Sequence, residues 1–471
     1  MKLKYFIILC CAVVFSSCDD FLEEESQDLI VPKTVQDYRE LLFGEAYIGA
    51  DDRVNLYLDV MTDDVKEYLK AWGFGGDFRK QAYGYYTWQK NPEYRFDGAI
   101  TKDNAWEMYY HNILIANVIL DKVMDAQGSD MEKEDTKGEA HFIRAYSYFM
   151  LVNLYGKPYD KLTAETELGV PLNLKSSVQD KLFRRETVAR IYQQIEDDIE
   201  LSIEELEDAK ISKNFFRVTP VAAHLLASRI YLYEKKYTKV IEHADKVIAA
   251  KPALYDLTQY NDEVFLQFKN PEILFSYGTY DSYNYYFNPM AKGKFLPSSE
   301  LMSEYYSSDR RKNIYFVRKM FKYYPNKSNS DNTVGAYGKA FRTSEAYLNR
   351  AEAYAETDEV EKAMADLNLL RKNRITGLYM QSAADRDEAI AKVRAERRRE
   401  LCFEDQRWFD LRRWDQPSIT HVFTDPTSKE KSTFTLQEKS AAYTLAIPQE
   451  VRDFNPEIKN NERPDRIPAS N

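Results

Sequence analysis

The sequence has few residues that break helices. Glycine and proline number 16 each among 471 residues, about 3.4% apiece, below their usual shares of roughly 7% and 5%. Hydrophobic residues make up 44% of the chain and aromatic residues 14%, which excludes a collagen-like, low-complexity or disordered chain. We therefore expect a globular protein with long uninterrupted helices, built as about three domains or as one large repeat-based unit.

Positive charge is in deficit. The chain has 65 Lys and Arg against 76 Asp and Glu, a formal net charge of -11. A general nucleic-acid binder needs a surplus of Lys and Arg to neutralise phosphates. The composition therefore excludes that class of function.

Long hydrophobic runs are also missing. The apolar run at residues 5–15 follows Lys2 and Lys4 and is too short for a membrane-spanning helix, which needs about 20 residues. Small residues then precede Cys18, an arrangement that resembles the lipobox of bacterial lipoproteins. We predict a signal peptide at residues 1–17 and a lipid on Cys18, so that the protein is anchored to a membrane rather than embedded in it.

Cysteine is scarce, with four in the chain. Cys10 and Cys11 leave with the signal peptide and Cys18 takes the lipid, so only Cys402 remains and no disulfide forms within the mature chain. Cys402 lies in a helical pattern and is predicted to be a small core residue. Residues 18–33 form an acidic tether, which is either a solvated spacer or a sorting signal for the outer face of an outer membrane.

Helical hairpins dominate the rest of the pattern. Thr34 and Asn104 are each followed three residues later by an acid, which predicts a helix start. Small residues and a tyrosine around Ala227 precede a second apolar helix, and the same spacing recurs around Ala351. The predicted fold is mainly α, with tetratricopeptide-like helical hairpins at about 104–155, 185–255 and 340–414 that pack as one array.

Two segments differ from this scaffold because they are aromatic, irregular and without helical periodicity. They lie within predicted loop-rich inserts at about 60–100 and 256–340. Their rings are Tyr68, Trp72, Phe74, Phe78, Tyr83, Tyr85, Tyr86, Trp88, Tyr94 and Phe96, then Tyr277, Tyr280, Tyr283, Tyr285, Tyr286 and Phe287. The inserts are therefore the candidate ligand-binding part of the protein.

Motifs for catalysis and metal binding are missing. The five histidines are scattered singly, without H-E-x-x-H or a Cys/His metal spacing, and no G-x-S-x-G elbow is present. Glycines 73, 75 and 76 give an incomplete dinucleotide loop, because Phe78 stands where the last glycine belongs. We predict no enzymatic activity, no metal and no cofactor. The cluster Arg394 to Arg399 alternates with glutamates and predicts ion pairs within and between helices.

A series of motifs then resembles one family. The strongest stretches are SEAYLNRAEA at 344–353, ERRRELCFE at 396–404 and RWFDLRRW at 407–414. Earlier landmarks are Trp106, Tyr109, Ile113, Asn117, Glu139, Arg144 and Tyr155, and later ones are Leu445, Pro448, Asn455 and Asn460. In this order they resemble the SusD/RagB family of nutrient-binding outer-membrane lipoproteins of Bacteroidetes, and the resemblance runs from the lipobox to the C-terminus.

This resemblance implies a single SusD-like domain at 34–471, α-rich with a tetratricopeptide-like scaffold. It implies a lipid anchor in the outer membrane, with the protein facing the cell exterior. The partner would be a SusC-like TonB-dependent transporter, over which the lipoprotein acts as a lid that captures an oligosaccharide without cleaving it.

The candidate ligand-binding residues follow from the resemblance and from sugar chemistry. Sugar C–H faces lie on aromatic rings, while hydroxyl groups seek polar partners at the edge. In this family the ligand surface uses aromatics shortly after an acidic turn, here residues 62–64. The candidates are Asp64, Tyr68, Trp72 and Phe74, with Tyr283, Tyr285 and Tyr286 across from them.

Other interpretations stay open. The rings could fill a loop-rich core. The ligand could be a peptide, as in the RagB branch. The protein could also be a structural repeat scaffold or, with paired carboxylates, a glycoside hydrolase.

Overall fold

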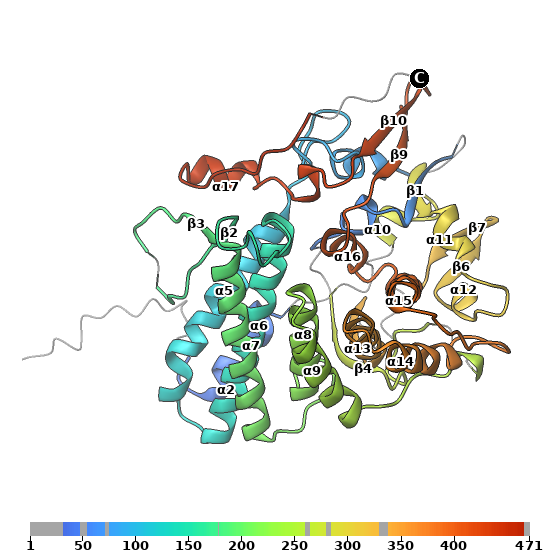
Figure 1. Cartoon of the computed structure of the whole chain (residues 1–471). Helices are drawn as coiled ribbons and strands as arrows, with labels where there is room; N and C mark the ends of the chain where they lie inside the picture. Colours follow the sequence, from blue (N-terminus) through green and yellow to red (C-terminus); the bar gives the residue numbers. More distant parts are fainter. Residues whose placement is uncertain are drawn as a thin grey trace, which may run out of the picture.

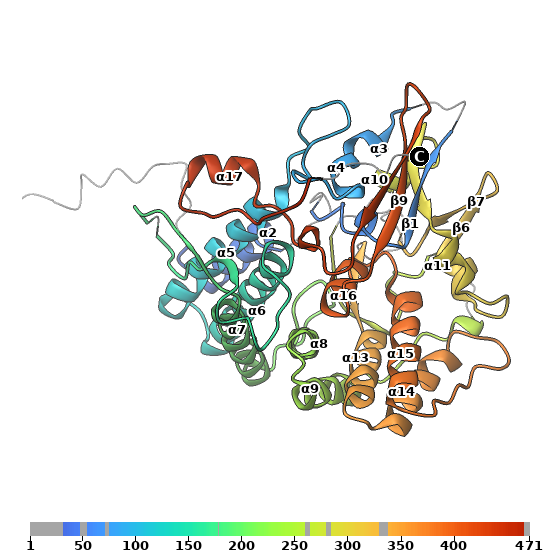
Figure 2. The same ribbon diagram turned by 45° about the horizontal axis from the view of Figure 1, so that its top comes forward.

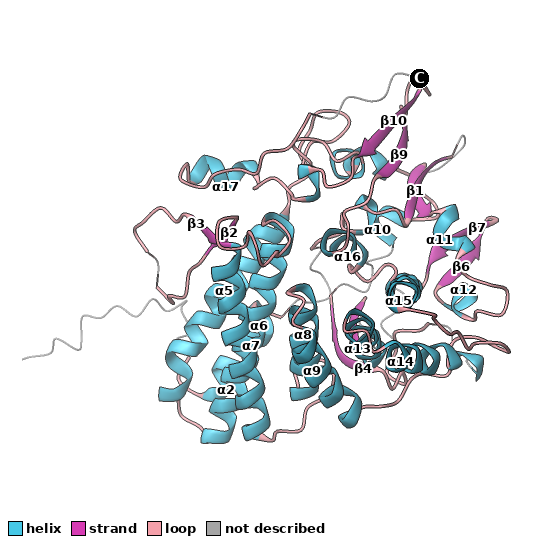
Figure 3. Cartoon of the chain, in the orientation of Figure 1, coloured by secondary structure: helices cyan, strands magenta, loops and turns pink. Residues whose placement is uncertain are grey.

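A computed structural model of the chain describes residues 32–47, 54–70, 75–177, 179–259, 264–278, 284–328 and 338–465. The predicted signal peptide and Cys18 lie outside these residues. Long helices fill one part of the molecule, and most of the short strands lie among loops on another side (Figures 1 and 3).

The long helices follow one another as an array of neighbours. They are α2 (Val35–Glu45), α5 (Asn104–Lys122), α6 (Asp130–Tyr155), α7 (Val188–Ala209), α8 (Pro220–Tyr233), α9 (Tyr237–Ala250), α13 (Thr343–Glu356), α14 (Val360–Lys372) and α15 (Arg386–Leu401). Consecutive helices from α5 to α9 pack on each other, α9 packs on α13, and α13 contacts α14 and α15. The predicted mainly α fold with helical hairpins is confirmed (Figure 1).

Helix starts depend on short polar side chains. Thr34 and Asp37 form the predicted capping box of α2, with the Asp37 N–H donating to Thr34 Oγ1 at 3.2 Å and the Thr34 N–H donating to Asp37 Oδ2 at 2.8 Å. Thr219 caps α8 ahead of Pro220, as the sequence suggests. The predicted box at Asn104 is wrong by one residue, because Asp103 accepts from the Ala105 N–H and is the cap of α5.

The two inserts contain strands that local patterns do not show. β1 (Val65–Leu69) pairs antiparallel with β5 (Gly293–Pro297), and β4 (Ile273–Tyr277) pairs with β8 (Lys339–Arg342). Hairpins β6–β7 (Phe316–Lys319, Lys322–Pro325) and β9–β10 (Ile419–Thr424, Lys431–Leu436) flank them. The remaining pair is β2–β3 (Leu168–Pro171, Arg185–Thr187). Single-turn helices complete the inserts: α3 (Phe78–Gln81), α4 (Tyr83–Tyr86), α10 (Asn284–Phe287), α11 (Ser299–Ser303) and α12 (Arg311–Ile314). The β1–β5 pair therefore joins the first insert to the second.

A buried ion-pair network links the scaffold to the second insert. Glu400 of α15 accepts hydrogen bonds from Arg342 at 2.9 Å, from Arg374 at 2.9 Å and from Arg311 at 3.1 Å, and none of these side chains is exposed. Together the three guanidiniums hold the pKa of the Glu400 carboxyl well below its usual range, although burial alone would raise it.

The arginine cluster of α15 also makes the predicted ion pairs. Arg397 lies 2.8 Å from Asp410 of α16 (Arg407–Arg413), and Arg399 lies 2.7 Å from Glu396 within α15. The prediction of ion pairs within and between helices is confirmed, because each guanidinium is matched by a carboxylate and the low-dielectric interior strengthens the pairing.

Cys402 follows α15 and is 1% exposed. Its sulfur contacts the Tyr305 hydroxyl at 3.2 Å, and burial raises the pKa of the Cys402 thiol to about 11. The prediction of a core thiol is confirmed. Among the helices in the described ranges, none is long and apolar enough to cross a membrane.

Candidate functional site

Strand β1 presents Tyr68 in the region that the sequence marks for ligand binding. Side chains alternate along a strand, so Lys66 and Tyr68 point to one side of β1 and Glu67 to the other, and Lys70 directly follows the strand. Tyr68 lies directly opposite Lys294 of β5 in the antiparallel register, and residues opposite each other share a face. Tyr68 is half-buried, so part of the residue stays open to solvent.

A cavity of about 1010 Å³ lies beside β1. It is lined by the whole of β1, by the start of α11 and by the β9–β10 hairpin, which Figure 2 shows next to β1. Polar groups line it at several points, among them Lys66, Glu67, Ser299 and Thr420. Its size suits a ligand of several sugar rings, since ligand pockets commonly span about 300–1,000 Å³.

Glu67, one of the residues that line the cavity, is held by Arg79. Its guanidinium pairs with Glu67 and lies 2.8 Å from Asp77, and the Thr424 hydroxyl also donates to Glu67. The Arg79 side chain is fully buried. These bonds fix the side of β1 that faces away from Tyr68, so the strand is a rigid support for the ring.

Asp64, a predicted ligand-binding residue, is 2% exposed. Arg398 of α15 donates to its Oδ1 at 2.7 Å, and the neighbouring Asp63 receives two hydrogen bonds from Arg407 at 2.7 and 2.8 Å. Burial raises the pKa of the Asp64 carboxyl, while Arg398 opposes that rise. The structure therefore places Asp64 in an ion pair that connects the turn before β1 with the scaffold. This pair lies beneath the cavity rather than on its rim.

The other aromatic residues predicted to bind the ligand lie in different surroundings. Tyr285 donates its hydroxyl to Gln81 at 2.8 Å and lies 5.6 Å from the Phe78 ring, so it joins the two inserts. Tyr286 is 4% exposed and packs against Phe295 of β5. The remaining candidates, Trp72, Phe74 and Tyr283, lie outside the described residues and stay predictions.

Many rings of the first insert belong to the core. Tyr85, Tyr86 and Trp88 are at most 2% exposed. His421 of β9 stacks between Tyr86 and Trp88, with ring centroids 4.1 and 4.4 Å away. Burial lowers the pKa of the His421 imidazole to about 4, so the ring is neutral at physiological pH. The core-filling interpretation therefore holds for these three rings and not for Tyr68.

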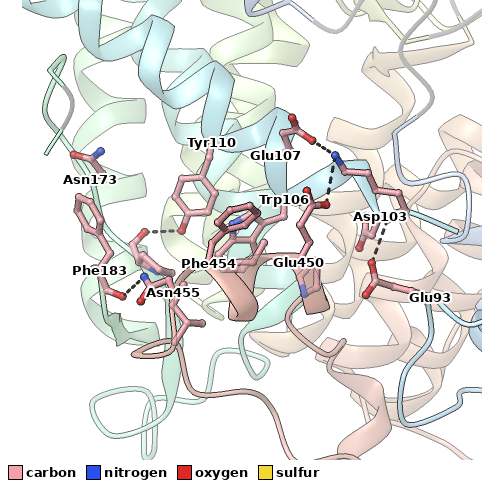
Figure 4. Close-up of a pocket in the computed structure, with 15 residues that line it drawn as sticks. Glu93, Asp103, Trp106, Glu107, Tyr110, Asn173, Phe183, Glu450, Phe454 and Asn455 are labelled. Carbon is pink, nitrogen blue, oxygen red and sulfur yellow. Dashed lines mark hydrogen bonds and ion pairs between the residues drawn. The ribbon is translucent and has the colours of Figure 1, made fainter. Parts of the chain in front are cut away.

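Sequence reasoning missed a second pocket, of about 370 Å³, between α5 and α17 (Gln449–Phe454). Figure 4 shows Trp106 and Tyr110 of α5 facing Phe454, with Phe183 at one end. The Phe454 ring is 80% exposed. No local pattern could have shown this pocket, because its walls come from distant parts of the chain.

The other end of this pocket is polar. Lys102 lies 2.6 Å from Glu107 and 3.6 Å from Glu450, and Glu93 accepts from the Asp103 N–H at 3.4 Å (Figure 4). Asp103 also accepts hydroxyl bonds from Tyr155 at 2.6 Å and Tyr57 at 3.1 Å. Burial raises the pKa of the Asp103 carboxyl to about 6.

Metal chemistry finds no support in the parts of the chain that the structure describes. No group of three or more His, Cys, Asp or Glu side chains there is arranged to hold a metal ion. The cavity beside β1 combines an aromatic face with hydroxyl, amine and carboxylate groups, which is an arrangement for binding a polar ligand.

Two family models match the chain. Residues 20–232 match a model described as starch-binding associating with outer membrane, and residues 258–463 match the model of the SusD family. A SusD-like protein of Formosa agariphila is 25% identical over 266 residues, which are 52% of this chain and 46% of that relative. The chain thus aligns with less than half the length of this curated relative.

Solved structures show the same fold over nearly the whole chain. A SusD superfamily protein from Bacteroides thetaiotaomicron is 24% identical, with a TM-score of 0.71, and the match covers 91% of this chain and 100% of the other. A Bacteroides vulgatus protein whose proposed role is sugar binding is 25% identical, with a TM-score of 0.71 and coverage of 92% and 99%. A SusD-like carbohydrate binding protein from the same species is 18% identical, with a TM-score of 0.69 and coverage of 92% and 98%.

Proposed function

The chain belongs to the SusD/RagB family, and from this premise we propose that it is a glycan-binding lipoprotein of the cell surface. It captures an oligosaccharide without cleaving it and delivers it to a SusC-like TonB-dependent transporter. Cys18 carries the lipid that anchors it in the outer membrane, with the protein facing the cell exterior. It needs no cofactor.

The half-buried Tyr68 ring beside the β1 cavity carries this proposal. A sugar ring lying on it would gain C–H contacts with the aromatic face, while its hydroxyl groups reach the polar side chains of the cavity wall. Lys66 Nζ and Ser299 Oγ are 2.6 Å apart, and both residues line the cavity. They therefore offer a hydrogen-bond donor and an acceptor within reach of the sugar's hydroxyl groups. The description of one matched family model supports the ligand class, because that model is described as starch-binding.

Binding of oligosaccharides to the purified chain tests the proposal. We expect a glycan array followed by titration calorimetry to identify a ligand, and Tyr68→Ala to weaken its binding by about 1–3 kcal/mol, as for an aromatic hot spot. Tyr94→Ala is the matched control, because Tyr94 is 43% exposed and does not line the β1 cavity. Equal loss of binding in both variants would contradict the assignment of the site.

The same samples separate the competing functions. Retention of the glycan without new reducing ends supports capture, whereas new reducing ends would mean glycoside hydrolysis. Binding of peptides instead of glycans would favour the peptide-binding alternative. Binding of neither, with retention of another surface protein, would favour a structural scaffold.

Membrane anchoring and delivery to a transporter are tested in cells. We expect Cys18→Ala to release the protein from the membrane fraction without changing glycan binding in solution. Affinity purification of the lipidated protein should recover a TonB-dependent transporter. Recovery of the Cys18→Ala variant in the membrane fraction would contradict lipidation at this residue.

A further inference from the structure

Lysines surround Tyr68. Lys66 lies on the same side of β1 and Lys70 directly follows the strand. Lys294 of β5 lies directly opposite Tyr68, and Lys322 belongs to β7, which packs on β5. The Nζ atoms of Lys294 and Lys322 lie 5.7 and 5.4 Å from the centroid of the Tyr68 ring. Strands β5 and β7 thus bring two ammonium groups to an aromatic ring of the distant strand β1.

These ammonium groups lack carboxylate partners among the residues that the structure describes. Lys66 Nζ donates to Ser299 Oγ at 2.6 Å, and the nearest polar contact of Lys70 Nζ is the Met320 sulfur at 3.8 Å. Lys294 Nζ donates only to backbone carbonyl groups, those of residues 289 and 291. In a chain with a net charge of -11, where most buried cations pair with acids, this is an unusual concentration of unneutralised positive charge.

Three of the acids around β1 pair with arginines. Glu67 and Asp77 both pair with Arg79 behind β1, and Asp63 pairs with Arg407 and Arg398 below the cavity. Glu300 of α11 lines the cavity on the side of Ser299. Among the described residues, no ion pair joins Glu300 or these three acids to Lys66, Lys70, Lys294 or Lys322.

Unneutralised charge at close quarters has a cost, and a ligand anion would remove it. Lys294 is 1% exposed, and burial together with the nearby Lys70 ammonium lowers the pKa of the Lys294 side chain to about 8. A sulfate or carboxylate placed beside the more accessible Lys322 and Lys70 would form charge-assisted hydrogen bonds with ammonium groups that have no carboxylate partner among the described residues, and it would also lie near the buried Lys294 charge.

We propose that the ligand taken at Tyr68 is an anionic glycan, one whose sugar rings carry sulfate esters or uronic acid carboxylates. The proposal rests on the function proposed above. One sugar ring lies on Tyr68, and its acidic substituent, or that of the adjoining ring, is held by Lys322, Lys70 and Lys66. Arginine would bind a carboxylate in a fixed bidentate geometry, whereas lysines are mobile point charges that accept either acidic group.

Titration calorimetry with matched oligosaccharides tests this. The probes are a sulfated galactan oligosaccharide with its desulfated form, and an oligogalacturonate with its fully methyl-esterified form. We expect at least one acidic probe to bind about tenfold or more tighter than its neutral counterpart at 50 mM salt. This advantage should shrink at 300 mM salt, because salt screens exposed charges. The two pairs distinguish sulfate from carboxylate as the recognised group.

Lysine variants test which side chains cause the preference for acidic probes. We expect Lys322→Ala and Lys70→Ala each to weaken acidic-probe binding about threefold to tenfold, with little change for the neutral probe and recovery in Lys322→Arg. Lys246→Ala is the matched control, since Lys246 is exposed on α9, far from β1 in Figures 1 and 2. Unchanged melting temperatures would show that these surface variants fold normally.

Failure of this inference and failure of the proposed function give different results. Equal binding of acidic and neutral probes, both lost in Tyr68→Ala, overturns the anionic specificity and leaves glycan capture intact. Tighter binding of acidic probes that no lysine variant changes overturns the lysine assignment. Absence of binding to any glycan overturns the proposed function itself.

Discussion

Arg398 Nε lies 2.7 Å from Asp64 Oδ1, which ties the last long helix of the scaffold, α15, to the turn that precedes β1. The two residues are far apart in the chain, yet their pairing sets the position of the strand that presents Tyr68. Asp64 is nearly fully buried, so its charge depends on this partner.

Removal of Arg398 should therefore destabilise the fold. Arg398→Ala leaves a buried carboxylate without its cation, and we expect the free energy of unfolding to fall by about 3 kcal/mol in urea denaturation. Arg184→Ala is the matched control, because Arg184 pairs with Glu457 while 78% exposed, and exposed pairs contribute about 0–1 kcal/mol. Equal effects of the two variants would contradict a structural role for the Arg398–Asp64 pair.

The buried Asp103 should make stability depend on pH. Its pKa is about 6 in the folded protein against 3.8 for an aspartate fully exposed to water, so the folded state holds the proton at pH values where the unfolded state has lost it. The contribution of Asp103 to the free energy of unfolding is then largest below pH 4 and is lost as pH rises through 6. Relative to Asp103→Asn, we expect the free energy of unfolding to fall by about 2–3 kcal/mol from pH 3.5 to 7.5.

The comparison with Asp103→Asn is needed because other groups titrate in the same pH range. Their contributions to the free energy of unfolding are the same in both proteins and cancel in the difference. The asparagine keeps an oxygen that accepts from Tyr155, Tyr57 and the Ala105 N–H. Parallel stability profiles for the two proteins would show that burial does not perturb this carboxyl.

Binding of an acidic glycan should weaken at alkaline pH. The ammonium of Lys294 lies near the rings of Tyr68 and Tyr324, and Lys322 also lies over the Tyr68 ring. Burial and the nearby Lys70 ammonium lower the pKa of Lys294 to about 8. Above that pH it loses the charge that attracts the anion. We expect affinity for an acidic probe to fall by about threefold to tenfold from pH 7 to 9.5, while a neutral probe changes little.

Trp72 and Trp88 should respond differently to truncation. The sequence predicts Trp72 as a ligand-binding ring, so Trp72→Ala should weaken glycan binding by about 1–3 kcal/mol with little change in melting temperature. Trp88 is fully buried, and Trp88→Ala should cost about 3–5 kcal/mol of folding stability. Unchanged binding isotherms or a collapsed melting temperature for Trp72→Ala would overturn its assignment.

Local patterns in the sequence were enough for the scaffold. Small residues such as Ala227 and Ala351 are fully buried where paired helices meet, and capping residues such as Thr34 mark helix starts because their bonds reach only three residues along the chain. The ion pairs of Arg397 and Arg399 were predictable for the same reason, since alternation of charges on a helix is a local pattern.

The candidate site could be predicted only in part. Tyr68 is a prediction from the family resemblance, which points to aromatics shortly after an acidic turn. The partner of Asp64 lies on α15, and no local pattern marks that pairing. The lysines around Tyr68 were missed, because Lys294 and Lys322 join it through strand pairing and packing between distant segments. The alternating residues 66–70 were the one available signal, since period-two spacing places two lysines and a tyrosine on one side of a strand.

Cys402 is buried and its thiol has a pKa of about 11, so it stays in the unreactive protonated form at neutral pH. It is the one free cysteine among the residues that the structure describes. A cysteine introduced at Thr420, which is exposed on the cavity wall, would therefore react with a maleimide fluorophore while the native thiol remains unlabelled. Burial of this single sulfur thus makes the protein a ready scaffold for a fluorescent sensor that reports glycan capture in real time.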